Sequence, residues 1–215
     1  GGIGRIAHAE SRCKERMMVD LIFLFLITII IYAFALFYRT SGAVFVKDGV
    51  YEQIAVVDAV SSDHRNTRLL YQDRTTSSGM YQDSSASLFP YTDYFRLYRL
   101  TDTVPKSALF IGAGAYTMPK LLHSEVPDAR IDVVEIEPHI EDIAHEYFAL
   151  SETAMIRTYT LDGRMFLAHS TSSYDLIFSD VYYTMNSVPA HVTTKEFFRR
   201  AHARLSPKGI FLANI

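Results

Sequence analysis

The chain has 215 residues, of which 49% are hydrophobic and 21% are charged, and its formal net charge is -3. This length can bury one sizeable core. The balance of charge lacks the basic patch that nucleic-acid binding requires, so we expect no nucleic-acid partner. The single cysteine, Cys13, excludes an internal disulfide, and the eight histidines form no metal-binding motif, so we expect no metal site.

The first element along the chain is an uncharged apolar stretch from Leu21 to Tyr38. A helix of this length measures about 27 Å, close to the thickness of the hydrocarbon core of a bilayer. We therefore predict an N-terminal flank over residues 1–18 and one transmembrane helix over residues 19–40. A buried core helix and a signal peptide are the alternatives, although no small-residue cleavage site follows cleanly.

Short β patterns follow this stretch. Tyr51–Val60 and Thr67–Gln72 are rich in β-branched and aromatic residues, and the turn-like sequence SSDHRN separates them. They predict a small antiparallel β-hairpin layer. With a polar loop over residues 82–90 and a linker helix over residues 93–100, this layer makes up a unit at residues 48–100.

Strands and helices alternate from residue 104 onward. Short apolar strands separated by helices are typical of βαβ units and of a parallel sheet that is buried on both faces. We predict a Rossmann-like α/β domain over residues 104–215, with its C-terminal strands missing. The expected strands are 108–111, 131–136, 156–160, 174–179 and 210–215, and the expected helices are 116–123, 140–150, 164–169 and 194–205.

Two glycines follow the first of these strands in the sequence ALFIGAGAYT, residues 108–117. Gly112 and Gly114 would let the backbone turn tightly and approach a ligand, although such a turn can equally be structural. Thr117 takes the third glycine position of the dinucleotide pattern GxGxxG, which disfavours a pyrophosphate cofactor.

Acidic residues follow the next two strands. Glu135 could accept both hydroxyls of a ribose; Glu137 is a second candidate, and a solvated strand end is the alternative. Asp162 could accept an adenine amino group while Gly163 leaves room for the ring, although Asp162 could also be a simple helix N-cap. Ligands bind outside the carboxyl ends of parallel strands, so we expect these residues to surround one adenosine.

Asp180 closes the fourth strand in the sequence YDLIFSD. There its carboxylate could orient or deprotonate an attacking amine, and a capping role is the alternative. The loop over residues 181–190 is long enough to cover a substrate. Tyr182 and Tyr183 in this loop could line a substrate pocket or simply pack.

In their order and spacing, the segments VYEQIAVVDA, LLYQDRTTSSGMY, LFIGAGAYT, VVEIEP, LDGRMFL and YDLIFSDVYY resemble the spermidine synthase-like (polyamine aminopropyltransferase) family, particularly its membrane-fused members. The family binds decarboxylated S-adenosylmethionine and moves its aminopropyl group onto an amine. The resemblance implies that Gln53 contacts this cofactor, that Glu135 binds the ribose and Asp162 the adenine, and that Asp180 is the catalytic acid/base.

The chain departs from the family pattern at several polar positions. Ala115 stands where an aspartate of the glycine loop holds the aminopropyl ammonium. The usual LDGxxQ keeps Asp73, a candidate substrate-binding residue, but has Arg74 and Ser77 in place of the glycine and the glutamine. The second aspartate that follows the catalytic one is absent after Asp180. A dication needs carboxylates to replace its hydration, so cofactor binding is better supported than polyamine synthesis.

Three functions stay open. An aminopropyltransferase-like enzyme would alkylate a small-molecule amine acceptor, with Asp180 taking the proton. A methyltransferase that uses ordinary S-adenosylmethionine is favoured by Ala115, because an aspartate there would repel the carboxylate of the full cofactor. A non-catalytic nucleoside-sensing domain of a transporter-like membrane protein is favoured by the predicted span and by the lost carboxylates.

The predicted span also bears on location and partners. Four basic residues precede it and two closely follow it, which by the positive-inside rule puts the N-terminal side in the cytoplasm. A cytoplasmic cofactor puts the C-terminal side there instead. Both ends of the chain suggest a piece of a longer protein, and if earlier spans precede it, the local count of basic residues does not decide the orientation. From the cofactor we therefore expect a soluble domain facing the cytoplasm at the inner or plasma membrane. Expected partners are the amine acceptor, membrane lipid and, as a homodimer, a second copy.

Overall fold

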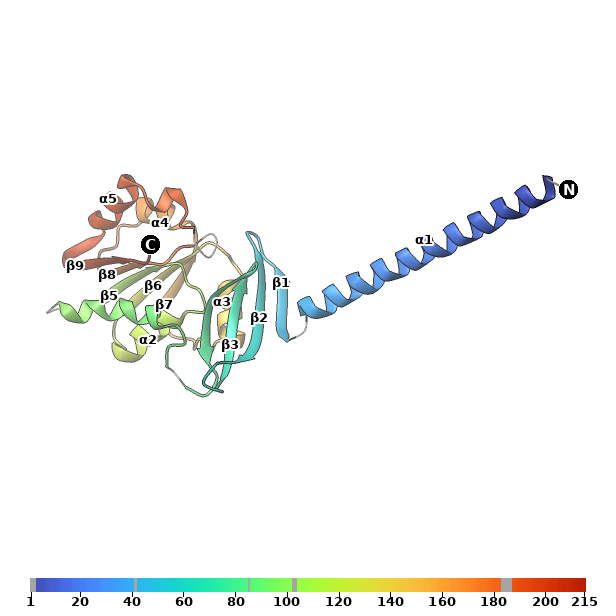
Figure 1. Cartoon of the computed structure of the whole chain (residues 1–215). Coiled ribbons are helices and arrows are strands. Elements are labelled where there is room, and N and C mark those ends of the chain that lie inside the picture. Colours follow the sequence, from blue (N-terminus) through green and yellow to red (C-terminus); the bar gives the residue numbers. More distant parts are fainter. Residues whose placement is uncertain (1–2, 41, 85, 102–103, 183–186) are drawn as a thin grey trace. The chain divides into compact units, whose positions relative to one another are not determined.

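The computed structural model describes residues 3–40, 42–84, 86–101, 104–182 and 187–215. The chain divides into two compact units, residues 1–42 and residues 43–215 (Figure 1). The first unit is one helix, α1 (Ile3–Thr40), which is longer than the predicted span because it also includes most of the predicted flank. Its window Arg16–Ala33 has a mean hydropathy of 2.2 and is long and apolar enough to cross a membrane. Length and composition alone also fit a signal sequence or a core helix.

The second unit begins with a four-stranded antiparallel sheet in the order β1-β2-β3-β4. The predicted hairpin is present as β2 and β3, which pair in register from Ile54–Gln72 to Val60–Asn66. Two flanking strands that we did not predict extend it. The strands are β1 (Ala43–Asp48), β2 (Gln53–Val60), β3 (Asn66–Gln72) and β4 (Thr75–Tyr81).

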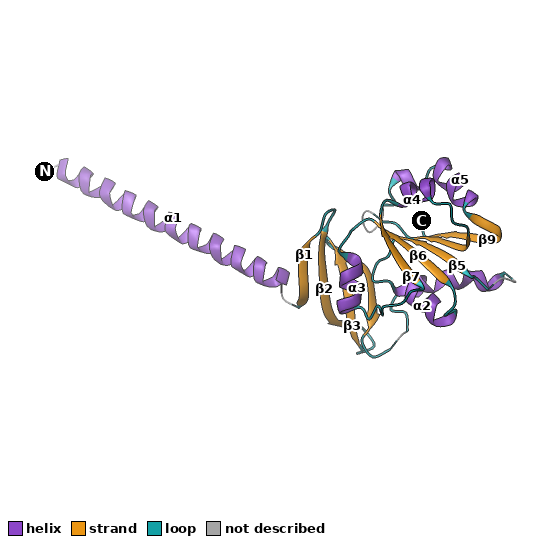
Figure 2. Ribbon diagram, turned by 180° about the vertical axis from the view of Figure 1, so that it is seen from behind, coloured by secondary structure: helices purple, strands orange, loops and turns teal. Residues whose placement is uncertain are grey.

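The rest of this unit contains a five-stranded parallel sheet in the order β7-β6-β5-β8-β9 (Figure 2). The predicted α/β alternation with a preceding antiparallel layer is confirmed. The strands are β5 (Ser107–Ile111), β6 (Arg130–Glu135), β7 (Ile156–Thr160), β8 (Tyr174–Ser179) and β9 (Leu205–Ala213). The helices are η1 (Pro90–Leu100), α2 (Thr117–Glu125), α3 (Ile140–Tyr147), α4 (Gly163–His169), η2 (Ala190–Val192) and α5 (Lys195–Ala203).

Two apolar cores lie on the two faces of the parallel sheet. Successive strand residues point to opposite faces, so Phe110 of β5 belongs to one core and Leu109 to the other. The Phe110 core contains side chains of α2 and α3, and it also contains Ile54 and Leu70 of the antiparallel sheet. The Leu109 core contains side chains of α4 and α5. The shared core therefore fixes the antiparallel sheet against the parallel one.

Strand order reverses at β5, which has β6 on one side and β8 on the other. In open α/β sheets such a switch point leaves a crevice beside the carboxyl ends of the strands, where ligands bind. The predicted glycine turn and the predicted acidic residues lie at the carboxyl ends of these strands, so the topology brings them to one edge of the parallel sheet.

Candidate active site

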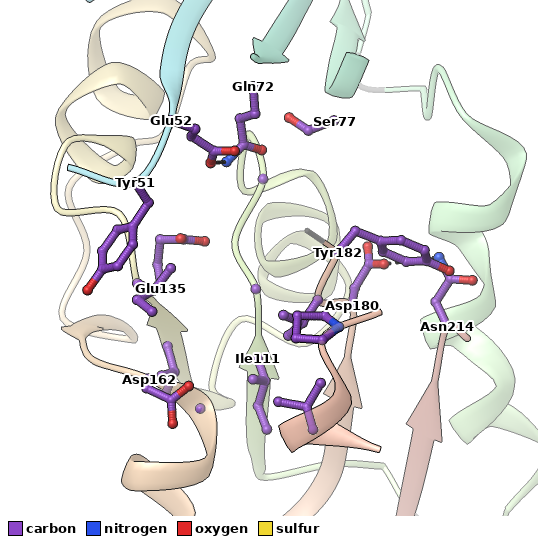
Figure 3. Close-up of a pocket in the computed structure, with 18 of the residues that line it drawn as sticks. Tyr51, Glu52, Gln72, Ser77, Ile111, Glu135, Asp162, Asp180, Tyr182 and Asn214 are labelled. Atoms are coloured by element: carbon purple, nitrogen blue, oxygen red, sulfur yellow. Dashed lines mark hydrogen bonds between the residues drawn. The ribbon is translucent and has the colours of Figure 1, made fainter. Parts of the chain in front are cut away.

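A cavity of about 780 Å³ lies at the carboxyl ends of β5, β6 and β8 (Figure 3). This volume is in the range of sites that bind small molecules. Residues of the antiparallel sheet and of the switch point both line it. The polar and glycine residues among them are Tyr51, Glu52, Gln72, Asp73, Thr75, Thr76, Ser77, Tyr91, Gly112, Gly114, Glu135, Asp162, Gly163, Asp180, Tyr182, His191 and Asn214.

The glycine turn after β5 is held tightly by its neighbours. Gly112 has φ +90°, and a Cβ there would lie 2.2 Å from the carbonyl oxygen of Asp180. Gly114 has φ +49°, and a Cβ there would lie 3.1 Å from the Cβ of Ser78 in β4. Glycine tolerates both the positive φ and the close approach. The turn therefore packs against the end of β8 and against the antiparallel sheet while it lines the cavity.

The Glu135 carboxyl group is directed at this glycine turn. Its Oε2 accepts a hydrogen bond of 2.9 Å from the backbone N–H of Ala113, and its Oε1 accepts one of 2.9 Å from the N–H of Glu137. Glu135 is only 8% exposed. Burial raises the pKa of this carboxyl, and the backbone N–H groups act in the opposite direction. The backbone N–H of Ile136 also acts on this carboxyl, which still lines the cavity.

Glu137, the second candidate for the ribose, has a different place. It does not line the cavity, and its Oε2 accepts hydrogen bonds from the backbone N–H groups of Val50, at 2.7 Å, and Tyr51, at 3.0 Å. Its side chain is almost completely buried. Glu137 therefore fastens the β1–β2 connection to the segment after β6, and Glu135 is the carboxylate that faces the cavity.

Asp162 lines the cavity and caps a helix at the same time. Its Oδ1 accepts a hydrogen bond of 2.9 Å from the N–H of Met165 at the start of α4, and its Oδ2 lies 2.9 Å from Nε2 of His191. The capping alternative is thus present, and the contact with His191 had no signal in the sequence. At Gly163 a Cβ would lie 2.3 Å from Cγ2 of Ile111, so glycine allows α4 to approach β5 closely.

Asp180 lies across the cavity from Asp162 (Figure 3). Two of its neighbours, Asn214 and Tyr91, were not predicted from the sequence. Nδ2 of Asn214 donates a hydrogen bond of 3.0 Å to Oδ1 of Asp180. Burial raises the pKa of Asp180, while hydrogen bonds from Asn214 and Tyr91 lower it. A raised carboxyl pKa suits a general base that works near neutral pH. Tyr182 lines the cavity beside Asp180, and Tyr183 is outside the described residues.

Gln53 is the cofactor contact that the family resemblance implies. Gln53 does not line the cavity, and its Nε2 donates a hydrogen bond of 2.8 Å to Oδ1 of Asp48. The two residues before it, Tyr51 and Glu52, lie in the bend that precedes β2, and both line the cavity. Asp73 does line the cavity, in the β3–β4 turn, where its Oδ1 accepts a hydrogen bond of 2.9 Å from the N–H of Gln53.

Among the residues that the structure describes, no group of three or more His, Cys, Asp or Glu side chains is arranged to hold a metal ion.

No model of a protein family matches the chain. It is 28% identical over 166 residues to the polyamine aminopropyltransferase of Vibrio vulnificus, covering 73% of this chain and 55% of that protein. It is 38% identical over 109 residues to a probable polyamine aminopropyl transferase of Bifidobacterium longum, covering 51% and 24%. It is 26% identical over 123 residues to the human eEF1A lysine and N-terminal methyltransferase, covering 52% and 18%. The chain thus spans about half the length of the first of these relatives and less than a quarter of the length of the other two.

All these relatives are transferases. Solved structures with a similar fold include a probable spermidine synthase from Corynebacterium glutamicum, with a TM-score of 0.66, 23% identity and coverage of 79% of this chain and 62% of that one. Spermidine synthase from Thermotoga maritima has a TM-score of 0.63 and 16% identity, covering 80% and 56%. The expected likeness to spermidine synthases is confirmed, and these comparisons support an enzyme of the transferase kind.

Proposed function

We propose that the chain belongs to a membrane-anchored, spermidine synthase-like transferase that uses decarboxylated S-adenosylmethionine, or a related adenosyl sulfonium, to alkylate an amine. The observation that carries this proposal is the buried Glu135 carboxyl, held by two backbone N–H groups at the glycine turn, with Asp180 in the same cavity. The similarity to aminopropyltransferases over 73% of the chain supports it.

The cavity residues fit an adenosine on three counts. The Glu135 carboxylate lines the cavity and suits a ribose, because a carboxylate has about four acceptor sites and can accept a hydroxyl beside its backbone donors. Asp162 offers a carboxylate at the same edge, and Gly163 lets the start of α4 approach Ile111 so closely that both residues line the cavity. When bound, the sulfonium supplies a carbon that an amine can attack, and its sulfur leaves as a neutral thioether.

In this proposal Asp180 accepts the proton that the attacking amine loses. It has an ordered donor on one oxygen, because Asn214 donates to Oδ1, and this fixes the direction of the carboxyl group. Holding the amine in line with the bond that breaks would supply most of the rate gain. Tyr182 would lie beside the acceptor, since it lines the cavity next to Asp180 (Figure 3).

A methyltransferase is the second candidate function, and one residue favours it. Ala115 stands where the family has an aspartate, which would repel the carboxylate of ordinary S-adenosylmethionine; in the structure Ala115 is buried in the apolar core and does not line the cavity. The similarity to the eEF1A methyltransferase, over 52% of the chain, is consistent with this alternative.

Titration calorimetry on the whole chain in detergent micelles separates these functions. The ligands are S-adenosylmethionine, its decarboxylated form and methylthioadenosine. Tighter binding of the decarboxylated form, with aminopropyl transfer to an amine, is the expected result. Tighter binding of ordinary S-adenosylmethionine would favour a methyltransferase. Equal binding of all three without turnover of any amine would refute the proposed reaction and favour a non-catalytic nucleoside-sensing domain.

Two variants test the assigned roles. Glu135→Gln removes the charge and leaves one backbone N–H group without an acceptor, so it should lower the stability of the fold and weaken adenosyl binding by about 2 kcal/mol or more. Asp180→Asn can still accept from Asn214 and should abolish turnover while ligand affinity is nearly kept. An Asn variant as active as the natural chain would remove Asp180 from the chemistry.

Membrane anchoring through α1 is tested by extraction. Sodium carbonate should leave the chain in the membrane pellet, and a matched chain without residues 1–42 should become extractable. Protease added to sealed inverted vesicles should degrade residues 43–215 if this unit faces the cytoplasm. Protection of this unit would refute the proposed orientation.

A further inference from the structure

Glu52 is a carboxylate of the cavity that comes from the antiparallel sheet, not from the strand ends of the parallel sheet. It immediately precedes β2, and its side chain lines the cavity together with that of Gln72 (Figure 3). Nε2 of Gln72 donates a hydrogen bond to Oε1 of Glu52. Among the residues that the structure describes, Gln72 is the donor of the side-chain hydrogen bond to the Glu52 carboxyl.

The charge of Glu52 is poorly compensated by its surroundings. The charged groups that face it are the carboxyls of Glu135, Asp73 and Glu137, and burial is the main cause that raises the pKa of Glu52 to about 7. Among the described residues that line the cavity there is no lysine or arginine. A half-buried carboxylate without a cation is unfavourable, and it is typical of sites where a ligand supplies the missing charge.

The fold does not require a charge at this position. A glutamine has nearly the same shape, and its side-chain oxygen can accept the same hydrogen bond from Gln72. A glutamate at this position therefore differs from a glutamine chiefly in the negative charge that it offers to a ligand.

We infer that Glu52 is the specificity-determining residue that binds a primary ammonium group on the chain attached to the sulfur of the adenosyl ligand. This inference rests on the proposed function. Glu52 lies across the cavity from Asp162, where the adenine would bind, so a ligand that extends away from the adenosine reaches toward it (Figure 3). Ala115, which stands at the position of the family's aspartate for the aminopropyl ammonium, carries no charge and is buried in the apolar core, and Asp180 is needed for the acceptor amine.

Two thioethers that differ only in the ammonium test this inference. One is 5′-(3-aminopropylthio)-5′-deoxyadenosine and the other is its 5′-propylthio analogue, both measured by calorimetry at pH 8 on the whole chain in micelles. The natural chain should bind the aminopropyl compound at least about tenfold more tightly, as one charge-assisted hydrogen bond would give. In Glu52→Gln this preference should fall below about threefold, while the affinity for the propyl compound stays within about twofold.

Asp128→Asn serves as the matched control, because it removes one negative charge from an exposed residue outside the cavity and should keep the full preference. A Glu52→Gln variant that keeps the preference would overturn the inference but leave the proposed function intact. If the natural chain binds neither compound, the proposed function fails, and the inference fails with it.

A second measurement uses the natural chain alone. At pH 7, an ammonium that binds next to Glu52 should displace on the order of half a proton, because about half of the Glu52 carboxyls carry one when the pKa is about 7. Calorimetry in two buffers of different ionisation enthalpy measures this release. The aminopropyl compound should show it and the propyl compound should not. Equal proton release with both compounds would overturn the inference even if Glu52→Gln does not fold.

Discussion

Glu137 connects the two sheets through a pair of short hydrogen bonds, and removing it should loosen one specific connection. The perturbation is Glu137→Ala, which leaves the N–H groups of Val50 and Tyr51 without the carboxylate oxygen that they share at 2.7 and 3.0 Å. Because the carboxyl is only 1% exposed, water does not readily replace it. The shortened side chain also leaves a void next to Gly49.

The size of the effect follows from these contacts. A hydrogen bond to a charged acceptor stabilises a protein by about 1.5–3 kcal/mol, and the two donors share one oxygen, so we expect a loss of about 3 kcal/mol. For a domain of this size such a loss lowers the melting temperature by roughly 6–12 °C. Glu137→Gln keeps one oxygen for both donors and should cost only about 1 kcal/mol.

Thermal unfolding measures the overall effect, and amide hydrogen exchange locates it. In Glu137→Ala the amides of Val50 and Tyr51 should lose protection, while amides in the middle of β5 keep theirs relative to global unfolding. Glu137→Gln should keep most of the protection at both positions. If Val50 and Tyr51 remain as protected in the alanine variant as in the natural chain, the proposed connection between the sheets is wrong.

Three further predictions concern the cavity. Gly163→Ala brings a Cβ to 2.3 Å from Cγ2 of Ile111, so overpacking should lower the free energy of unfolding by about 1–3 kcal/mol in urea, and an unchanged value would contradict the packing. Burial raises the pKa of Glu52 from 4.5 to about 7, so the folded chain holds this proton more tightly than the unfolded chain. Stability measured in urea should therefore fall as pH rises through this interval, and Glu52→Gln should make that fall smaller. Asn214→Ala removes a hydrogen bond that lowers the pKa of Asp180, so the acid limb of the pH–rate profile should move to higher pH, because only the ionised carboxyl is a base.

The parallel sheet could be predicted from the sequence because its strands are short apolar runs between amphipathic helices. The strands over Ile156–Thr160 and Tyr174–Ser179 coincide with their predictions, and the boundaries of the other predicted elements differ by a few residues. The helix predicted over residues 140–150 ends earlier, at Tyr147, since Ala149 adopts a positive φ of 54° that no helix continues. The apolar pattern thus defines which elements exist, and local backbone conformation determines where they end.

Two strands escaped prediction because pairing partners, not their own residues, determine them. The sequence of β4, TTSSGMY, has no continuous apolar run, yet it pairs along β3 and buries Ser78 against the turn at Gly114. In the site, the family resemblance indicated Gln53, whereas the neighbouring residue Glu52 lines the cavity. A shift of one residue changes the face of a strand, and the sequence alone does not determine that register.

Gly112 and Gly114 would be required even if this chain bound no ligand. A Cβ at either position would meet the carbonyl oxygen of Asp180 or the side chain of Ser78, so the glycine motif alone is weak evidence for a cofactor. Glu135 also has a structural reason for its charge, because its two oxygens accept from two backbone N–H groups that an amide could not both satisfy.

Asp180 and Glu52 differ from these residues in one respect. An asparagine or a glutamine could accept the hydrogen bonds that Asn214 and Gln72 donate, so the fold explains the polarity of both side chains but not their charge. Keeping a carboxylate half-buried without a cation is unfavourable for folding. Function is therefore best tested at these two positions, since an isosteric amide removes the charge there and leaves the packing and the hydrogen bonds in place.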